Sequence, residues 1–280
     1  MNNPMLSHIS QVLSNIRLQK PLVHHITNYV TVNDCANIVL AIGGAPVMAD
    51  DSEEVKEIVS ISSALVLNIG TLNQRTIESM IIAGTQAKEL KVPVIFDPVG
   101  AGASKLRTET AERIIETLKP TVIRGNISEI KTLIGLSAKT RGVDAAEEDL
   151  SQGNTLQDVT KAVEQYSRRT GSVVAITGAT DIISDGTRNC LIQNGHSMMS
   201  HVTGTGCMCT SLVGACCGAT KDYFIGTVAG IAMMGIAGEI AFNRIKTDVD
   251  GNSSYCNYII DAVYNLTDKT VEQQAKVTVA

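Results

Sequence analysis

The distribution of hydrophobic positions predicts a set of buried strands along the chain. Three runs are rich in β-branched apolar residues and end in glycine or in a polar residue. They are ALVLNIG (64–70), VPVIFDPVG (92–100) and SVVAITG (172–178), and a fourth run, TVIRGN (121–126), follows a Lys-Pro pair. Continuous apolar runs of this length are typical of parallel strands that are buried on both faces.

Helical patterns lie between these strands. Residues 73–90 repeat apolar positions at spacings of three and four, and we expect a helix there. Residues 107–119 predict another helix, which opens with Thr108 followed by acids that favour the positive end of the helix dipole. Strands that alternate with helices imply right-handed crossovers. The predicted fold is therefore α/β, with a central, mostly parallel sheet and helices on both faces.

Polar residues lie near the ends of the predicted strands. In parallel sheets the carboxyl ends of the strands meet at one edge, where ligands bind. Although far apart in sequence, these residues should therefore gather in one site: Asn68, Asp97, Arg124, Asn126 and Thr177.

Length and composition limit the function. With 280 residues, 44% hydrophobic and 18% charged, the chain can bury a large core, and we expect one domain spanning residues 1–280. The polar stretch 137–158 is interpreted as a surface loop with a helical piece. Aromatic residues make up 3%, Trp is absent and the net charge is -5, which argues against a nucleic-acid partner. A small metabolite fits better.

The seven cysteines form no C-x-x-C pair, and most are interpreted as small buried hydrophobes in a reducing cytosol. The N-terminus lacks the basic and apolar regions of a signal peptide. The most apolar stretch, 223–242, contains several Gly and Ala and also Glu239, and predicts a buried core helix with close packing. We therefore expect a cytoplasmic protein with no membrane partner.

The segment HVTGTGCMCTSL (201–212) is a candidate phosphate site. Gly204 and Gly206 permit close backbone approach, and a helix beginning near Cys207 would offer free N–H groups to an anion. Thr205 between them completes the candidate anion hole. A tight turn explains the two glycines equally well. Neither the P-loop nor the dinucleotide-binding pattern is present.

Two carboxylates are candidates for a metal site. Asp97 ends an apolar strand, where it could hold Mg²⁺ through water or cap a turn. Glu129 follows Asn126 at a helix start, where an N-cap is the simplest interpretation and a second metal carboxylate the alternative. Arg124 could clamp a phosphate with two hydrogen bonds.

The segment 21–51 combines apolar residues with many polar ones. His24 and His25 are adjacent, so on a strand they would point to opposite faces and could not easily share a metal. Two explanations remain open for the polar side chains: a buried, hydrogen-bonded connection, or one wall of a ligand site. These side chains are Asn28, Asn33, Asp34 and Asn37.

The chain resembles the hydroxyethylthiazole kinases of thiamine salvage. Five motifs carry the resemblance, in order: PLVHHITNYVTVNDCANIVLAIGGAPVM, FDPVGAGAS, RGNISEI, AITGATD and HVTGTGC. The match spans nearly the whole chain, from Pro21 to Glu239. The resemblance implies a ribokinase-like fold, a homotrimer, and transfer of phosphate from ATP, with Mg²⁺, to 4-methyl-5-(2-hydroxyethyl)thiazole. It departs at Gly44-Ala45, where many members read Ala-Ser.

The resemblance also implies roles for individual residues. Arg124 and Thr177 match ATP contacts, and Asp97 and Glu129 match acids near the magnesium. The matching thiazole contacts are Met48 and Gly204, with Asn28 and Val30 in the wall of a pocket shared between subunits.

Cys207 occupies the position at which related sugar and vitamin kinases carry a catalytic Asp. A thiol at a helix N-terminus should have a lowered pKa and could accept the proton of the substrate alcohol; alternatively, Cys207 only fills space. Competing functions are a pyrimidine or pyridoxal kinase of the same fold, and an acyl-transfer enzyme with Cys207 as nucleophile and His24, His25 or His201 as base. A redox-sensing or ligand-binding module is a further alternative, although Cys207 and Cys209 should point different ways.

Overall fold

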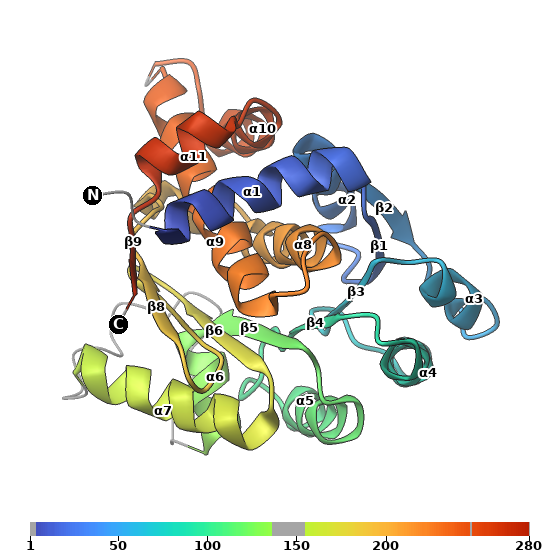
Figure 1. Ribbon diagram of the computed structural model, residues 1–280. Coiled ribbons are helices and arrows are strands. Elements are labelled where there is room, and N and C mark those ends of the chain that lie inside the picture. Colours follow the sequence, from blue (N-terminus) through green and yellow to red (C-terminus); the bar gives the residue numbers. More distant parts are fainter. Residues whose placement is uncertain (1–3, 136–154, 247, 280) are drawn as a thin grey trace.

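The computed structural model describes residues 4–135, 155–246 and 248–279, which form one nine-stranded sheet between two layers of helices (Figure 1). The strand order is β2-β1-β3-β4-β5-β6-β7-β8-β9. Pairs from β2 to β6 are parallel and pairs from β6 to β9 are antiparallel. The strands are β1 (Leu22–Ile26), β2 (Ala45–Met48), β3 (Ala64–Asn68), β4 (Val94–Asp97), β5 (Val122–Asn126), β6 (Val173–Thr177), β7 (Asp181–Ser184), β8 (Asn189–Ile192) and β9 (Val277–Val279).

The four apolar runs are confirmed as the parallel strands β3 to β6, each shorter than its run, and β4 by the most. The antiparallel edge β7 to β9 was not predicted. Its strands contain only three or four residues each, which is too short for a clear hydrophobic pattern.

Helices cover both faces of the sheet, as expected from the alternation of elements. One layer packs its apolar residues with Val23 and Val66. It contains α1 (Pro4–Gln19), α2 (Val32–Ile42), α8 (Thr205–Gly218), α9 (Tyr223–Arg244), α10 (Asn252–Tyr264) and α11 (Asp268–Gln274). The other layer packs with Leu65 and Phe96. It contains α3 (Val55–Ser60), α4 (Gln74–Leu90), α5 (Lys105–Leu118), α6 (Ile127–Ile134) and α7 (Leu156–Thr170).

The helix expected at 107–119 begins earlier, at Lys105. The side chain of Ser104 accepts a hydrogen bond from the backbone N–H of Arg107, so Ser104 is the N-cap. Thr108 is therefore inside the helix, and the first turn contains no acid. The expected pairing of acids with the helix dipole was wrong, because the helix begins before the acids that follow Thr108. Of the polar stretch 137–158, residues 137–154 lie outside the described residues.

The apolar stretch 223–242 is confirmed as a core helix, α9, packed against α8. A Cβ at Gly230 would lie 2.8 Å from the backbone of Val213, so the absence of a side chain permits this close approach. Among the described helices, α9 alone is long and apolar enough to cross a membrane. Most of its surface is buried inside the fold, as in the core helix of a globular protein.

The connections place a topological switch point at the carboxyl ends of β1 and β3. The helix after β1, α2, lies on one face of the sheet, whereas the helix after β3, α4, lies on the other. Neighbouring strands whose helices leave toward opposite faces open a gap between their loops, and ligands of α/β proteins bind there. Helix α8 packs on β1, β3 and β4.

Candidate active site

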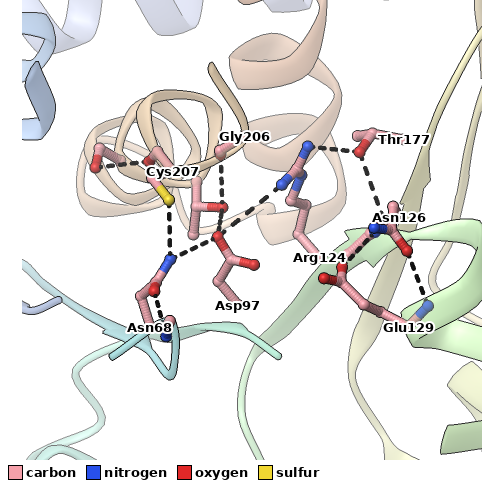
Figure 2. Close-up of polar contacts among 12 residues, drawn as sticks. Asn68, Asp97, Arg124, Asn126, Glu129, Thr177, Gly206 and Cys207 are labelled. Carbon is pink, nitrogen blue, oxygen red and sulfur yellow. Dashed lines mark hydrogen bonds and ion pairs between the residues drawn. The ribbon is translucent and has the colours of Figure 1, made fainter. Parts of the chain in front are cut away.

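Residues from four neighbouring strands and one helix meet at the carboxyl edge of the sheet (Figure 2). Asn68 and Asp97 end neighbouring strands and are paired in register. Arg124 lies on β5, and Thr177 ends β6. Cys207, in the first turn of α8, closes the cluster from above the sheet edge. The expectation that strand-end polar residues gather at one edge is therefore confirmed.

Gly204 and Gly206 shape the start of α8. Gly204 is the N-cap, with φ of +89° in the left-handed region, and a Cβ there would lie 2.5 Å from Thr31 Cγ2. A Cβ at Gly206 would lie 2.9 Å from Arg124 Nη1. The two glycines thus permit a tight entry into the helix and a close approach of the guanidinium. Thr205, the first helical residue, directs its hydroxyl to the carbonyl of Met199. The loop is both a turn and a helix start, so the two explanations of the glycines do not exclude each other.

Cys207 is held by two amides. Its Sγ accepts hydrogen bonds from Asn28 Nδ2 at 3.2 Å and from Asn68 Nδ2 at 3.3 Å. Burial and the nearby charge of Asp97 raise the pKa of the thiol, and these amides offset the rise only in part. The expected lowering of this pKa was wrong, because desolvation outweighs the helix N-terminus. In the described part of the chain, no histidine hydrogen-bonds to Cys207.

The two adjacent histidines do point to opposite faces. His24 Nε2 lies 2.7 Å from the carbonyl oxygen of Ala49, and His25 Nε2 lies 3.1 Å from Ser211 Oγ on α8. Neither imidazole is positioned as a base for Cys207, which disfavours the acyl-transfer alternative. All seven cysteines are free thiols, so the structure contains no disulfide of a redox switch.

Asn28 connects the end of β3 and the first turn of α8 to the backbone that follows β1. Its Oδ1 accepts hydrogen bonds from the backbone N–H groups of Val30 and Thr31 and from the hydroxyl of Thr31. Its Nδ2 donates to Asn68 Oδ1 at 3.0 Å as well as to Cys207. Of the two explanations for the polar residues of segment 21–51, a buried hydrogen-bonded connection applies to Asn28.

The two candidate metal acids differ in their surroundings. Glu129 accepts backbone N–H groups with both oxygens, from Gly100 and from Asn126, each at 2.8 Å. The predicted N-cap is confirmed, since Asn126 and Glu129 form a capping box at α6. Asp97 has one oxygen, Oδ1, that is buried and has no hydrogen-bond partner among the described residues. Burial raises the pKa of both carboxyl groups, and the nearby charge of Asp97 adds to the rise in the pKa of Glu129.

The residues present fit a magnesium ion that is held mainly by waters and phosphates. In the described ranges there is no cluster of three or more His, Cys, Asp or Glu that could cage a metal. Mg²⁺ commonly binds through one or two carboxylates together with water and substrate phosphate. The bare Oδ1 of Asp97 offers such a ligand, and the oxygens of Glu129 retain lone pairs for a water.

Arg124 faces the cluster from β5. Its Nη2 lies 2.5 Å from Thr177 Oγ1, and its Nη1 lies 3.9 Å from Asp97 Oδ2. Two predicted substrate residues lie nearer the rim. Met48 is half-buried at the carboxyl end of β2, beside His25, and Val30 is 57% exposed.

Two residues of the cluster were not assigned a role from the sequence: Asn68, noted only as a polar strand end, and Thr210. Thr210 Oγ1 donates to Asp97 Oδ2 at 2.8 Å. Thr210 follows Cys207 by three positions, so both lie on one helix face. This spacing of three positions was the sequence signal that could have identified Thr210 as a site residue.

Comparison with solved structures shows the fold class of the protein. The chain matches a pyridoxal kinase from Staphylococcus aureus in complex with ADP, with a TM-score of 0.64 and 16% identity, covering 93% of this chain and 99% of that one. It also matches a ribokinase-like superfamily protein from Enterococcus faecalis, with a TM-score of 0.63 and 11% identity, covering 91% and 89%. At such identities the likeness concerns the fold, which is that of the ribokinase-like proteins.

Closer relatives identify the family. The hydroxyethylthiazole kinase family model matches residues 13–269. A hydroxyethylthiazole kinase from Clostridium beijerinckii is 54% identical over 277 residues, covering 99% of each chain. The structure of the hydroxyethylthiazole kinase protein from Pyrococcus horikoshii has a TM-score of 0.85 at 35% identity and covers 97% of this chain and 98% of that one. The chain belongs to the hydroxyethylthiazole kinase family, which confirms the resemblance seen in its motifs.

Proposed function

We propose that this chain transfers the terminal phosphoryl group of ATP to the hydroxyl of 4-methyl-5-(2-hydroxyethyl)thiazole, giving the thiazole phosphate and ADP. The observation that carries this proposal is the meeting of the α8 N-terminus with Asp97 and Arg124 at one edge of the sheet. Phosphoryl transfer needs positioning and charge stabilisation more than covalent chemistry, and this site supplies both. Membership of the family names the substrate.

Arg124 and Thr177 bind ATP in this proposal. The guanidinium is desolvated and already aligned by Thr177 Oγ1, so its remaining N–H groups can pair with phosphate oxygens at little cost in side-chain entropy. The backbone N–H groups of Gly204, Thr205 and Gly206 form the anion hole. They lie in the Gly204 cap and first turn of α8, where no earlier helical carbonyl accepts from them.

The thiazole lies against the β1 and β2 ends. Met48 and Gly204 contact it directly, and Asn28 and Val30 form the wall. Asn28 acts by holding the Val30 and Thr31 backbone, because its own amide groups are already engaged.

Asp97 and Glu129 would hold Mg²⁺, with Glu129 acting through water, and the ion would supply positive charge that offsets the charge of the transferring phosphate. Asp97 would offer its unpaired Oδ1, and Glu129 keeps the Gly100 loop in place through its backbone hydrogen bonds. In its thiolate form, Cys207 accepts the alcohol proton as the new O–P bond forms, and Asn28 and Asn68 donate to the sulfur.

We further propose that the chain functions as a single domain, residues 1–280, in the cytoplasm, and assembles as a homotrimer. Large apolar side chains within the segment 25–50 favour assembly, because they are exposed in the isolated chain: Tyr29 at 77%, Val30 at 57% and Leu40 at 57%. Val30 belongs to the proposed thiazole wall and Tyr29 precedes it in the chain, so a neighbouring subunit would complete the pocket. Light scattering on the active protein tests the trimer.

The activity is tested by incubating the protein with Mg·ATP and a panel of alcohols. The panel contains the hydroxyethylthiazole, a hydroxymethylpyrimidine and pyridoxal, and ADP release is followed together with the mass of the product. The proposal expects the thiazole to be phosphorylated fastest. Faster phosphorylation of the pyrimidine or of pyridoxal would assign the chain to a different vitamin kinase activity.

A further inference from the structure

The two oxygens of the Asp97 carboxylate have very different surroundings. Oδ2 accepts hydrogen bonds from Asn68 Nδ2 at 2.9 Å and from Thr210 Oγ1 at 2.8 Å, and it is the oxygen nearer to Arg124. Oδ1 is buried and has no hydrogen-bond partner in the part of the chain that the structure describes. A buried oxygen without a hydrogen bond is costly, and buried polar atoms rarely lack partners unless a ligand, ion or water supplies one.

Asn68 is locked in the orientation that makes this contact. Its Oδ1 accepts hydrogen bonds from Gly70 N at 2.9 Å and from Asn28 Nδ2 at 3.0 Å. With both donors on the oxygen side, the Nδ2 group must face Asp97 and Cys207. A flipped amide would place its oxygen against the carboxylate and leave two donors unpaired, so the network itself selects the orientation.

Thr210 holds the same oxygen from the opposite side. It is fully buried on α8, and its hydroxyl reaches the carboxylate across the space between helix and sheet. The hydroxyl also lies 3.2 Å from the carbonyl of Gly206, but the shorter contact to a charged acceptor is the stronger one. Asn68 and Thr210 therefore fix the rotation of the carboxylate about its Cβ–Cγ bond.

We propose that Asn68 and Thr210 are positioning residues that hold Asp97 by Oδ2, so that Oδ1 stays available to Mg²⁺ or to a water on Mg²⁺. Figure 2 shows the free oxygen pointing away from Cys207, toward the side where Arg124 and Glu129 lie. If the carboxylate of Asp97 could rotate, either oxygen could take the place of Oδ1, and no single oxygen would be kept available to the metal. The inference rests on the proposed function, in which Asp97 serves the metal of Mg·ATP.

The test measures metal binding without turnover. Mn²⁺ replaces Mg²⁺ as the probe, a non-hydrolysable ATP analogue occupies the nucleotide site, and electron paramagnetic resonance reports free Mn²⁺. Thr210→Val keeps the side-chain volume and removes the donor, so we expect the Mn²⁺ dissociation constant to rise about 10–100-fold. Thr210→Ser restores the hydroxyl and should bind Mn²⁺ nearly as wild type does.

Thr227→Val is the matched control. Thr227 is also fully buried on a helix and donates to the carbonyl four residues earlier, Tyr223, but it lies on α9 and does not contact Asp97. This variant should leave Mn²⁺ binding unchanged. Asn68→Ala gives a second, independent loss of a donor to Oδ2, and it decides the question if Thr210→Val does not fold by circular dichroism.

Three results would overturn the inference: wild-type Mn²⁺ binding in both Thr210→Val and Asn68→Ala, an equal loss in Thr227→Val, or no recovery in Thr210→Ser. The proposed function fails separately. It is wrong if the wild-type protein does not phosphorylate the thiazole, whatever the variants do to Mn²⁺ binding.

Discussion

Arg124 and Thr177 end up 2.5 Å apart, Nη2 to Oγ1, although 53 positions separate them in the sequence. They are brought together because β5 and β6 are parallel neighbours, with Arg124 opposite Ala175 in the register. The side chain of Arg124 is only 11% exposed, and Gly206 leaves room for it against the first turn of α8. In the proposed function, this cation beside a helix N-terminus binds the phosphates of ATP.

Substitution Arg124→Ala should raise the KM for ATP more than the KM for the thiazole. A charge-assisted contact is worth roughly 1.5–3 kcal/mol, which corresponds to a change of about ten- to hundredfold. Steady-state kinetics with each substrate varied in turn measure the two constants. Arg244→Ala is the control, because Arg244 forms an exposed ion pair with Asp261 and is not part of the candidate site. An unchanged KM for ATP would remove Arg124 from the nucleotide site.

Gly204 should tolerate no side chain. Gly204→Ala forces alanine into a left-handed conformation, which costs roughly 1–2 kcal/mol, and drives its Cβ against Thr31. Gly171→Ala is a matched control, since Gly171 has φ of +72° and a Cβ there would meet no atom of the described residues within 4 Å. Urea unfolding should therefore show a larger loss for Gly204→Ala, accompanied by a higher KM for the thiazole. Equal losses in the two variants would mean that the contact with Thr31 is unimportant.

The parallel half of the sheet could be predicted from the sequence because each strand is buried on both faces. Runs such as 64–70 and 172–178 therefore contain almost no polar residue until they reach the site. The antiparallel edge was not predicted, because its strands are too short to give a clear hydrophobic pattern. β8, for example, alternates half-buried and buried positions over only four residues, which resembles a loop as much as a strand.

For the site, the sequence shows which residues reach the sheet edge but not how their atoms pair. Asp97, Arg124 and Thr177 could be named because they lie at or near strand ends. That Asn68 would hold one oxygen of Asp97 depends on the register of β3 against β4, which a single sequence does not contain. The predicted pKa shift of Cys207 was wrong for a related reason: burial of the thiol is a tertiary effect that outweighs the local helix end.

His25 should make the protein less stable in acid. Burial lowers the pKa of His25 to about 4, whereas the unfolded chain has the ordinary value of about 6.5. The unfolded state therefore binds the proton first, and this contribution to stability is complete above about pH 6.5 and is lost as pH falls toward 4. The maximum effect is about 3 kcal/mol.

The measurement must be a difference, because other buried groups act in the opposite direction. Burial raises the pKa of Asp181 to about 7, so its contribution to stability grows as pH falls below that value. We therefore compare wild type with His25→Asn by urea unfolding between about pH 7.5 and 4, a range that spans both pKa values of His25. The advantage of wild type over the variant should shrink across this range, while His8→Asn, at an exposed position, should follow wild type. A constant advantage would show that His25 does not titrate differently on unfolding.

The structure alters the expected chemistry of Cys207, because burial raises the pKa of its thiol instead of lowering it. Cys207→Ala should lower kcat and leave both KM values near wild type, because the proton moves only as the O–P bond forms. Since burial raises the pKa of the thiol, the sulfur is a weak acceptor at neutral pH, and we expect a loss of about 10²-fold, the lower end for general-base catalysis. The wild-type kcat should also rise with pH as more thiolate forms.

Cys207→Asp is the sharper experiment. The amides of Asn28 and Asn68 that now donate to the sulfur could donate equally to a carboxylate, but the charge of Asp97 would oppose it. If proton acceptance dominates, the Asp variant should match or exceed wild type, and its kcat should depend less on pH above neutrality. If repulsion dominates, it should be as slow as the Ala variant. An Ala variant with wild-type kcat and an unchanged pH profile would show that Cys207 only fills space behind the anion hole.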